Sequence, residues 1–238
     1  MAEVKKEIYG SRPSVLVKKL KENNIDFIQN LWFITCNRAI NQNIGTRYLV
    51  IIESIDDEVD LKIFNDFIPV YRFAFHNGKY FIKNLRNDEV TSFTNKGEFK
   101  DWIITTTDCE FRRGYALGSP NATEFSRFFR ENMGSGFTLT DVDFYITDKS
   151  VFIEEKTFIQ DGLGFLGVGQ CFSFGEITND ICPNIDFHII LNDSDDFYLV
   201  DFNSIDSNRR NSSTKWGNMV EFDLGEKYSI DEIIRKFK

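Results

Sequence analysis

The chain has little of the chemistry on which many hydrolases and metalloenzymes depend. Its 238 residues include two histidines, His76 and His188, which leaves little material for a histidine-based triad or a zinc centre. Four cysteines are scattered without a C-x-x-C pair, which excludes a zinc finger and argues against a disulfide scaffold. Because free cysteine is among the most buried residue types, we expect four buried thiols: Cys36, Cys109, Cys171 and Cys182.

Long apolar runs are missing as well. No run is long enough to cross a bilayer, and the N-terminal segment lacks the apolar core of a signal peptide. These two absences predict a cytoplasmic protein that does not enter a membrane.

Positive charge is scarce: 28 Lys and Arg residues face 37 Asp and Glu residues, for a net charge of −9. This balance argues against a nucleic-acid partner, because phosphate contacts require Lys and Arg. The deficit lies in one half, since residues 1–120 hold 17 Lys/Arg against 16 Asp/Glu, whereas residues 121–238 hold 11 against 21. An acidic protein can still carry a basic groove, so nucleic acid is not excluded.

Apolar material is abundant. Hydrophobic residues make up 42% of the chain and 25 residues are phenylalanine, enough for a substantial core. Asn77-Gly78 lies between two apolar runs and predicts a hairpin. Aromatic and β-branched residues predict further strands in the N-terminal half at 26–36, 48–55, 67–75 and 102–107.

Glycine, proline and small residues gather around residues 112–121. Such a composition is typical of a boundary between domains. We therefore predict a β-rich domain over 1–118 and a second domain over 119–238.

The most informative stretch runs from Asp143 to Lys156. Asp143 opens an apolar run, a polar turn follows, and a return strand ends in Glu154-Glu155-Lys156. Side chains alternate along a strand, so Glu154 and Lys156 point one way and Glu155 the other. Two carboxylates at the same end of a hairpin suit a hard cation such as Mg²⁺, and a neighbouring lysine can hold a water or offset charge on a phosphate. The alternative is an ordinary amphipathic hairpin with solvated charges.

This pattern resembles the PD-(D/E)xK nuclease superfamily, in which an Asp is followed by (Asp/Glu)-x-Lys on the next strand. Asp143 matches the lone Asp, Glu154-Glu155-Lys156 matches the second element, and Val142 stands where the family pattern has proline. Asp141 lies on the same face as Asp143 and is a second candidate. We prefer Asp143 because the apolar residues follow it directly.

The order of elements in the C-terminal half is also similar to that family. A helix is expected at 121–133, then the hairpin, a mobile loop at 160–168, a second helix from near Gly167 or Val168, and a strand at 186–191. The resemblance covers this half only. It implies a mixed α/β protein in which a β-rich N-terminal domain precedes a restriction-endonuclease-like core, with a central mixed sheet flanked by helices.

The resemblance also implies a metal site for Mg²⁺ or Mn²⁺. Asp143 and Glu154 would bind the metal, together with the backbone carbonyl of Glu155. Glu124 or Asp141 would hold an outer-sphere water or a second ion.

Two further roles follow from the resemblance. Lys156 would position the attacking water, and Gln170 on the second helix would orient a ligand or the scissile phosphate. Many relatives of this core act as dimers, so a homodimer is left open.

Three groups of cations are candidates for contacts with nucleic acid. They lie on a short helix at 12–22, just before the domain boundary, and in a polar loop at 203–215. A solvated helix face and a simple linker are the alternatives for the first two. The candidates are Lys18, Lys19, Arg112, Arg113, Arg209, Arg210 and Lys215.

The sequence thus predicts a Mg²⁺-dependent endonuclease that hydrolyses phosphodiester bonds of nucleic acid, with DNA favoured as substrate and the N-terminal half recognising it. Two alternatives stay open. The first is a catalytically inactive protein of the same fold that binds nucleic acid or protein. The second is an unrelated α+β protein whose acidic half binds another protein.

Overall fold

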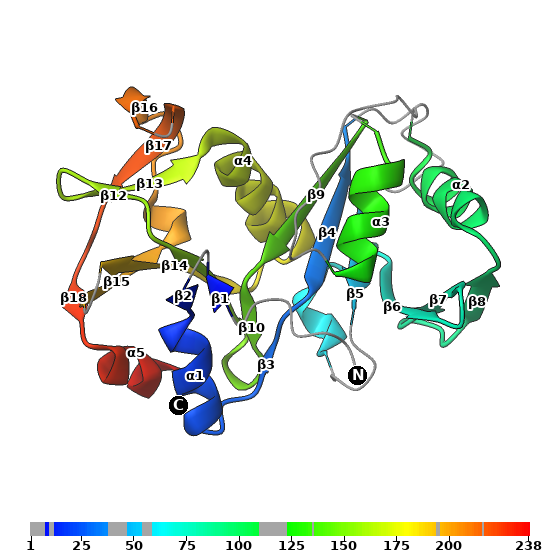
Figure 1. Cartoon of the computed structure of the whole chain (residues 1–238), viewed down its shortest axis with the longest axis horizontal. Helices are drawn as coiled ribbons and strands as arrows, with labels where there is room; N and C mark the ends of the chain where they lie inside the picture. Colours follow the sequence, from blue (N-terminus) through cyan, green and yellow to red (C-terminus); the bar gives the residue numbers. More distant parts are fainter. Residues whose placement is uncertain are drawn as a thin grey trace. The chain divides into compact units, whose positions relative to one another are not determined.

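The computed structural model of the chain describes residues 8–9, 12–37, 47–53, 59–109, 123–134, 136–193, 196–215 and 217–238. It is mixed α/β, as expected from the sequence, and divides into two compact units (Figure 1). Unit 1 contains the described residues between 30 and 141, and unit 2 contains those of 7–29 and 142–238. The expected boundary at 118–119 lies outside the described residues.

The helix and strand that follow this expected boundary belong to unit 1. Helix α3 (Glu124–Asn132) buries Phe125, Phe128 and Phe129 in the core of unit 1, and strand β9 (Phe137–Val142) joins the sheet of that unit. Unit 1 is therefore defined by packing between segments that are far apart in the sequence, which composition around residue 118 does not reveal.

Unit 1 is built on a mixed sheet whose described strands are ordered β8-β7-β6-β5-β4-β9. Helices α2 (Lys96–Thr107) and α3 share one core with this sheet. The rings of Phe73 and Phe99 lie 5.5 Å apart, and those of Phe99 and Phe128 lie 4.7 Å apart. The remaining elements are β4 (Leu31–Cys36), β5 (Tyr48–Ile52), η1 (Leu61–Ile63), β6 (Val70–His76), β7 (Lys79–Asn84) and β8 (Val90–Phe93).

Two predictions of local structure in unit 1 have opposite outcomes, and backbone conformation and helix capping explain them. The hairpin at Asn77-Gly78 is confirmed, with both residues in the left-handed region at φ 49° and 74°. The expected strand at 102–107 is wrong, because these residues form the second half of α2. The side chain of Asn95 caps that helix, and helical spacing buries Phe99 and Ile103, which outweighs the β-propensity of its threonines.

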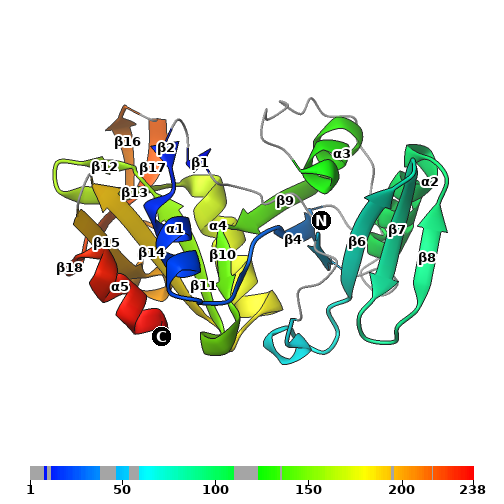
Figure 2. The same cartoon turned by 60° about the horizontal axis from the view of Figure 1, so that its bottom comes forward.

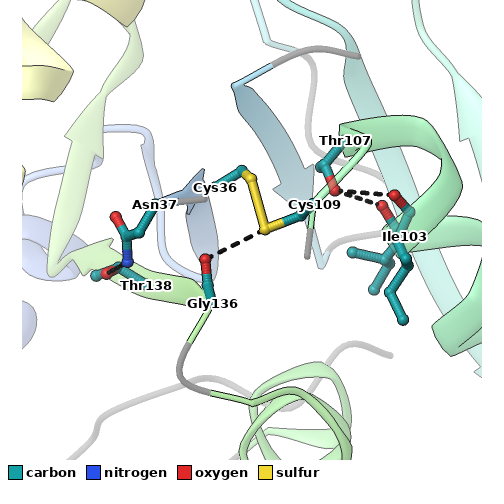
Figure 3. Close-up of a disulfide and its surroundings, with 8 residues drawn as sticks. Cys36, Asn37, Ile103, Thr107, Cys109, Gly136 and Thr138 are labelled. Carbon is teal, nitrogen blue, oxygen red and sulfur yellow. Dashed lines mark hydrogen bonds between the residues drawn. A yellow bond between two sulfur atoms is a disulfide. The ribbon is translucent and has the colours of Figure 1, made fainter. Parts of the chain in front are cut away.

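A disulfide joins two distant parts of unit 1 (Figure 3). Cys36 ends β4, Cys109 follows α2, and their Cα atoms lie 5.8 Å apart. The expectation of a free thiol is therefore wrong for this pair, since a separation of 73 residues carries no local signal. It is confirmed for Cys171 and Cys182, which are free and buried.

Unit 2 contains a second mixed sheet, whose described strands are ordered β18-β15-β14-β11-β10-β3. Strands β11 and β14 are parallel and the other neighbours antiparallel. Between β11 and β14 the chain forms β12 and β13 and then the crossover helix α4. The strands are β3 (Phe27–Ile28), β10 (Phe144–Ile146), β11 (Val151–Lys156), β14 (Asp186–Asp193), β15 (Asp196–Asp201) and β18 (Lys227–Tyr228).

Helices cover both faces of this sheet (Figures 1 and 2). Helices α1 (Val15–Glu22) and α5 (Ile230–Phe237) share a core with Phe144, Ile153 and Ile190. Helix α4 (Val168–Glu176) packs on the opposite face, where the Phe174 ring lies 4.8 Å from that of Phe187. The predicted start of α4 is confirmed. Ser229 and Glu232 form a capping box at the start of α5.

A smaller sheet with described order β12-β13-β17-β16 completes unit 2. The mobile loop expected at 160–168 is wrong, because its residues form most of β12 and β13. A Cβ atom on Gly164 would lie 2.5 Å from the Phe222 ring, so this glycine permits close packing between strands. The other elements of unit 2 are β1 (Ile8–Tyr9), β2 (Arg12–Pro13), η2 (Thr147–Lys149), β12 (Ile159–Gln160), β13 (Leu163–Gly167), η3 (Ile177–Ile181), η4 (Phe202–Ser204), β16 (Arg210–Thr214) and β17 (Gly217–Asp223).

Candidate active site

The register of β10 and β11 sets the geometry of the acidic hairpin. Phe144 pairs with Ile153 in this antiparallel ladder, so Asp143 lies opposite Glu154 at the next position. Opposed residues of an antiparallel pair share a face, and alternation then puts Lys156 on that face and Glu155 on the other. The hairpin closes through Ser150, whose φ of 52° is the left-handed conformation that a tight turn requires.

Hydrogen bonds connect these groups directly. The backbone N–H of Asp143 donates to Glu154 Oε2 at 3.2 Å, and the backbone N–H of Glu155 donates to Asp143 Oδ2 at 2.9 Å. Lys156 Nζ forms an ion pair with Glu154 Oε1. The structure thus brings Asp143, Glu154 and Lys156 into one cluster.

The cluster lies inside unit 2. Asp143, Glu154 and Lys156 are 3%, 4% and 7% exposed. Burial alone would lower the pKa of Lys156, but the charges of Glu154 and Asp143, the hydrogen bond with Glu154 and the charge of Glu155 outweigh it. The pKa of Lys156 is therefore raised above its ordinary value of 10.5, and the side chain stays an ammonium at neutral pH.

Glu155 occupies the opposite face of β11, next to helix α1. Its Oε2 accepts a hydrogen bond of 2.8 Å from the hydroxyl of Ser14, the N-cap of α1. Both side chains are buried. Sequence reasoning missed Ser14, because the two residues are 141 positions apart and no local pattern connects them.

The other proposed site residues, Glu124, Asp141 and Gln170, belong to elements other than β10 and β11. Glu124 begins α3 in unit 1 and forms an ion pair of 2.6 Å with Arg127. Asp141 is half-buried near the end of β9, also in unit 1. Gln170 is half-buried on α4, the helix that packs on the face of the sheet shared by Asp143 and Glu154.

The cations proposed to contact nucleic acid differ in their surroundings. Lys18 is exposed and 3.7 Å from Glu22. Lys19 donates to Asp231 at 3.1 Å, and this hydrogen bond is the main reason that its pKa is raised. Arg112 and Arg113 lie outside the described residues.

The β16–β17 region carries the remaining candidates. Arg209 is held by two carboxylates of β17, those of Glu221 at 3.0 Å and Asp223 at 3.2 Å. The guanidinium of Arg210 instead lies 5.7 Å from the centre of the Phe172 ring, which is 57% exposed on α4. Lys215 is exposed.

The described residues contain no group of three or more His, Cys, Asp or Glu side chains placed to hold a metal ion. The cluster therefore offers two carboxylates on one face. Mg²⁺ is commonly bound through one or two carboxylates and keeps several waters, so this donor set fits magnesium better than calcium, which takes more protein oxygens.

Comparison with models of protein families, with curated proteins and with solved structures finds no match for this chain. No helix in the part of the chain that the structure describes has the length and apolar character that a membrane crossing requires.

Proposed function

We propose that the protein is a Mg²⁺-dependent nuclease that hydrolyses phosphodiester bonds, with DNA favoured as substrate. One observation carries the proposal: Asp143, Glu154 and Lys156 share one buried face where two neighbouring strands meet. Burying charged side chains is costly, and such clusters are commonly retained for function.

The topology of unit 2 supports the resemblance to the PD-(D/E)xK superfamily. Strand β10 follows Asp143, β11 ends in Glu154-Glu155-Lys156, and the chain then passes through α4 to β14, which is parallel to β11. From the strand with the lone Asp onward this follows the expected order of a strand with (D/E)xK, a helix and a further strand, with β12 and β13 added before α4. The helix expected ahead of these strands, at 121–133, belongs to unit 1. Within the mixed α/β class, we propose a restriction-endonuclease-like core for unit 2.

Each residue of the cluster has its own role in the proposed hydrolysis. Asp143 and Glu154 would hold the cation, with the carbonyl of Glu155 as a third oxygen. A bound Mg²⁺ supplies Lewis-acid stabilisation of the phosphate and lowers the pKa of a coordinated water. Lys156, which forms an ion pair with Glu154, would act as a cationic donor that orients water or offsets phosphate charge.

Partner recognition rests on the exposed cations. Arg210 and the exposed ring of Phe172 combine a positive charge with an aromatic face, two features by which proteins bind nucleic-acid backbones and bases. Arg209 contributes less, since Glu221 and Asp223 already neutralise it.

A cleavage assay on plasmid and branched DNA tests the proposal. We expect nicking with Mg²⁺ or Mn²⁺, none in EDTA, and a loss of at least about 100-fold in rate for Lys156→Ala, the range that mutagenesis finds for one transition-state donor. Thr91→Ala in unit 1 is a control that leaves unit 2 untouched. Cleavage that survives Lys156→Ala at the normal rate contradicts the assignment.

A second candidate is a catalytically inactive protein of the same fold that binds nucleic acid or protein. The ion pair between Lys156 and Glu154 favours it, because Glu154, one of the proposed metal ligands, already pairs with the ammonium of Lys156. The two candidates differ in one result: the inactive protein binds DNA with the same affinity in EDTA and in Mg²⁺ and does not cut it.

A further inference from the structure

The middle residue of the Glu154-Glu155-Lys156 run has a side chain without a role in the proposed chemistry. Glu155 is 1% exposed and lies on the face of the sheet opposite Asp143 and Glu154. A buried carboxylate must be compensated by hydrogen bonds or charge. Ser14 provides such a bond, since its hydroxyl donates to Glu155 Oε2 at 2.8 Å.

Ser14 is held firmly in place for this contact. Its Oγ also accepts a hydrogen bond of 3.2 Å from the backbone N–H of Val17, which makes Ser14 the N-cap of α1. The helix is anchored in turn by Leu16 and Leu20, which are fully buried in the core shared with β10 and β11.

Glu155 connects this anchor to the metal-binding face through its backbone. Its N–H donates to Asp143 Oδ2 at 2.9 Å, and its carbonyl is the third oxygen proposed for the cation. The residues on either side of it, Glu154 and Lys156, belong to the cluster itself. A rotation of the Glu155 backbone would therefore move all of these groups together.

We propose that Ser14 is a positioning residue of the metal site. Its hydroxyl fixes the Glu155 side chain on the α1 face of β11, and the backbone of Glu155 then holds Asp143 and the metal-facing carbonyl in register. This inference rests on the proposed function. It assigns a role in that site to a residue 129 positions before Asp143 in the sequence.

Four variants separate positioning from simple capping. Ser14→Ala removes both the cap and the donor. Ser14→Asp keeps a good cap but cannot donate to a carboxylate, and Ser14→Thr keeps both functions. Thr123→Ala is the matched control, because Thr123 is likewise a buried N-cap, of helix α3 in unit 1.

The measurements are Mn²⁺ affinity by isothermal titration calorimetry, and kcat and KM for cleavage of plasmid DNA. Loss of an outer-shell partner typically costs about 10- to 100-fold in metal affinity or activity. We therefore expect Ser14→Ala and Ser14→Asp to lose about 10-fold or more in Mn²⁺ affinity and in kcat, with KM for DNA unchanged. Ser14→Thr and Thr123→Ala should stay within about threefold of the wild type, a range small beside the loss of an outer-shell partner.

Each failure has its own signature. A wild-type protein that binds Mn²⁺ and cuts DNA, with Ser14→Asp equal to it in both, overturns the positioning role and leaves the proposed function standing. Equal losses in Ser14→Ala and Thr123→Ala also overturn it, because they point to general destabilisation. A wild type that neither binds Mn²⁺ nor cuts DNA overturns the proposed function and the role of Ser14 with it.

Discussion

The disulfide of unit 1 permits a quantitative prediction. Replacing Cys36 and Cys109 by serine opens a loop that spans 73 positions of the chain. On the chain-entropy model, closing a loop of that length restricts the unfolded state enough to stabilise the native state by about 4 kcal/mol at 25 °C. With an m-value of about 4 kcal/mol/M, the unfolding midpoint of unit 1 should fall by about 1 M in guanidinium chloride.

The assay combines denaturation with thiol mapping. Oxidised wild type, reduced wild type and the double variant Cys36→Ser/Cys109→Ser are unfolded in parallel, and the reduced wild type should resemble the variant. Adding reductant to the variant should change nothing. Alkylation of the oxidised protein in denaturant, followed by peptide mass analysis, should label Cys171 and Cys182 and leave Cys36 linked to Cys109. Alkylation of all four cysteines, or equal midpoints for the oxidised wild type and the variant, would refute the reasoning.

Three further predictions concern the buried charges and the surface cations. Lys156→Met should lower the free energy of unfolding by about 3–5 kcal/mol in urea denaturation, because it removes the ammonium that contacts Glu154. Adding Glu154→Gln should recover most of this loss. If the effects of the two substitutions on the free energy of unfolding simply add, that result would count against the ion pair. Burial lowers the pKa of His188 below its ordinary value of 6.5, so the unfolded chain takes up a proton that the folded protein does not bind. The free energy of unfolding should therefore drop as the pH falls through 6.5, and His188→Gln should flatten this dependence on pH. An unchanged pH dependence in the variant would be the contrary result. In DNA titrations at several salt concentrations, Arg210→Ala should weaken binding and reduce the slope of log K against log [salt] by about one. Arg209→Ala should have a smaller effect, because carboxylates of β17 already neutralise Arg209. Equal effects of the two variants would be inconsistent with this difference.

Local patterns in the sequence predicted local structure well. The hairpin from Asp143 to Lys156, the turn at Asn77-Gly78 and the start of α4 each depend on residues close to one another in the sequence, and each is present. The shared face of Glu154 and Lys156 follows from strand alternation, and the register of β10 and β11 adds Asp143 to it.

Features that depend on distant partners could not be predicted. The segment 160–168 was expected to be a loop, since the Phe222 ring that fills the space beside Gly164 is 58 positions away and leaves no local signal. The Ser14–Glu155 bond and the Cys36–Cys109 disulfide join segments with no common motif. The β-propensity of residues 102–107 favoured a strand, whereas the cap at Asn95 and the burial of Phe99 make this segment part of helix α2.

The most direct test of the proposed function is a crystal structure of the protein soaked in Mn²⁺, with the ion located by its anomalous scattering. We predict one Mn²⁺ bound by carboxylate oxygens of Asp143 and Glu154, with the Glu155 carbonyl as a further ligand and the ammonium of Lys156 beside it. A cation bound at other residues, or no anomalous peak at this cluster in millimolar Mn²⁺, would contradict the account.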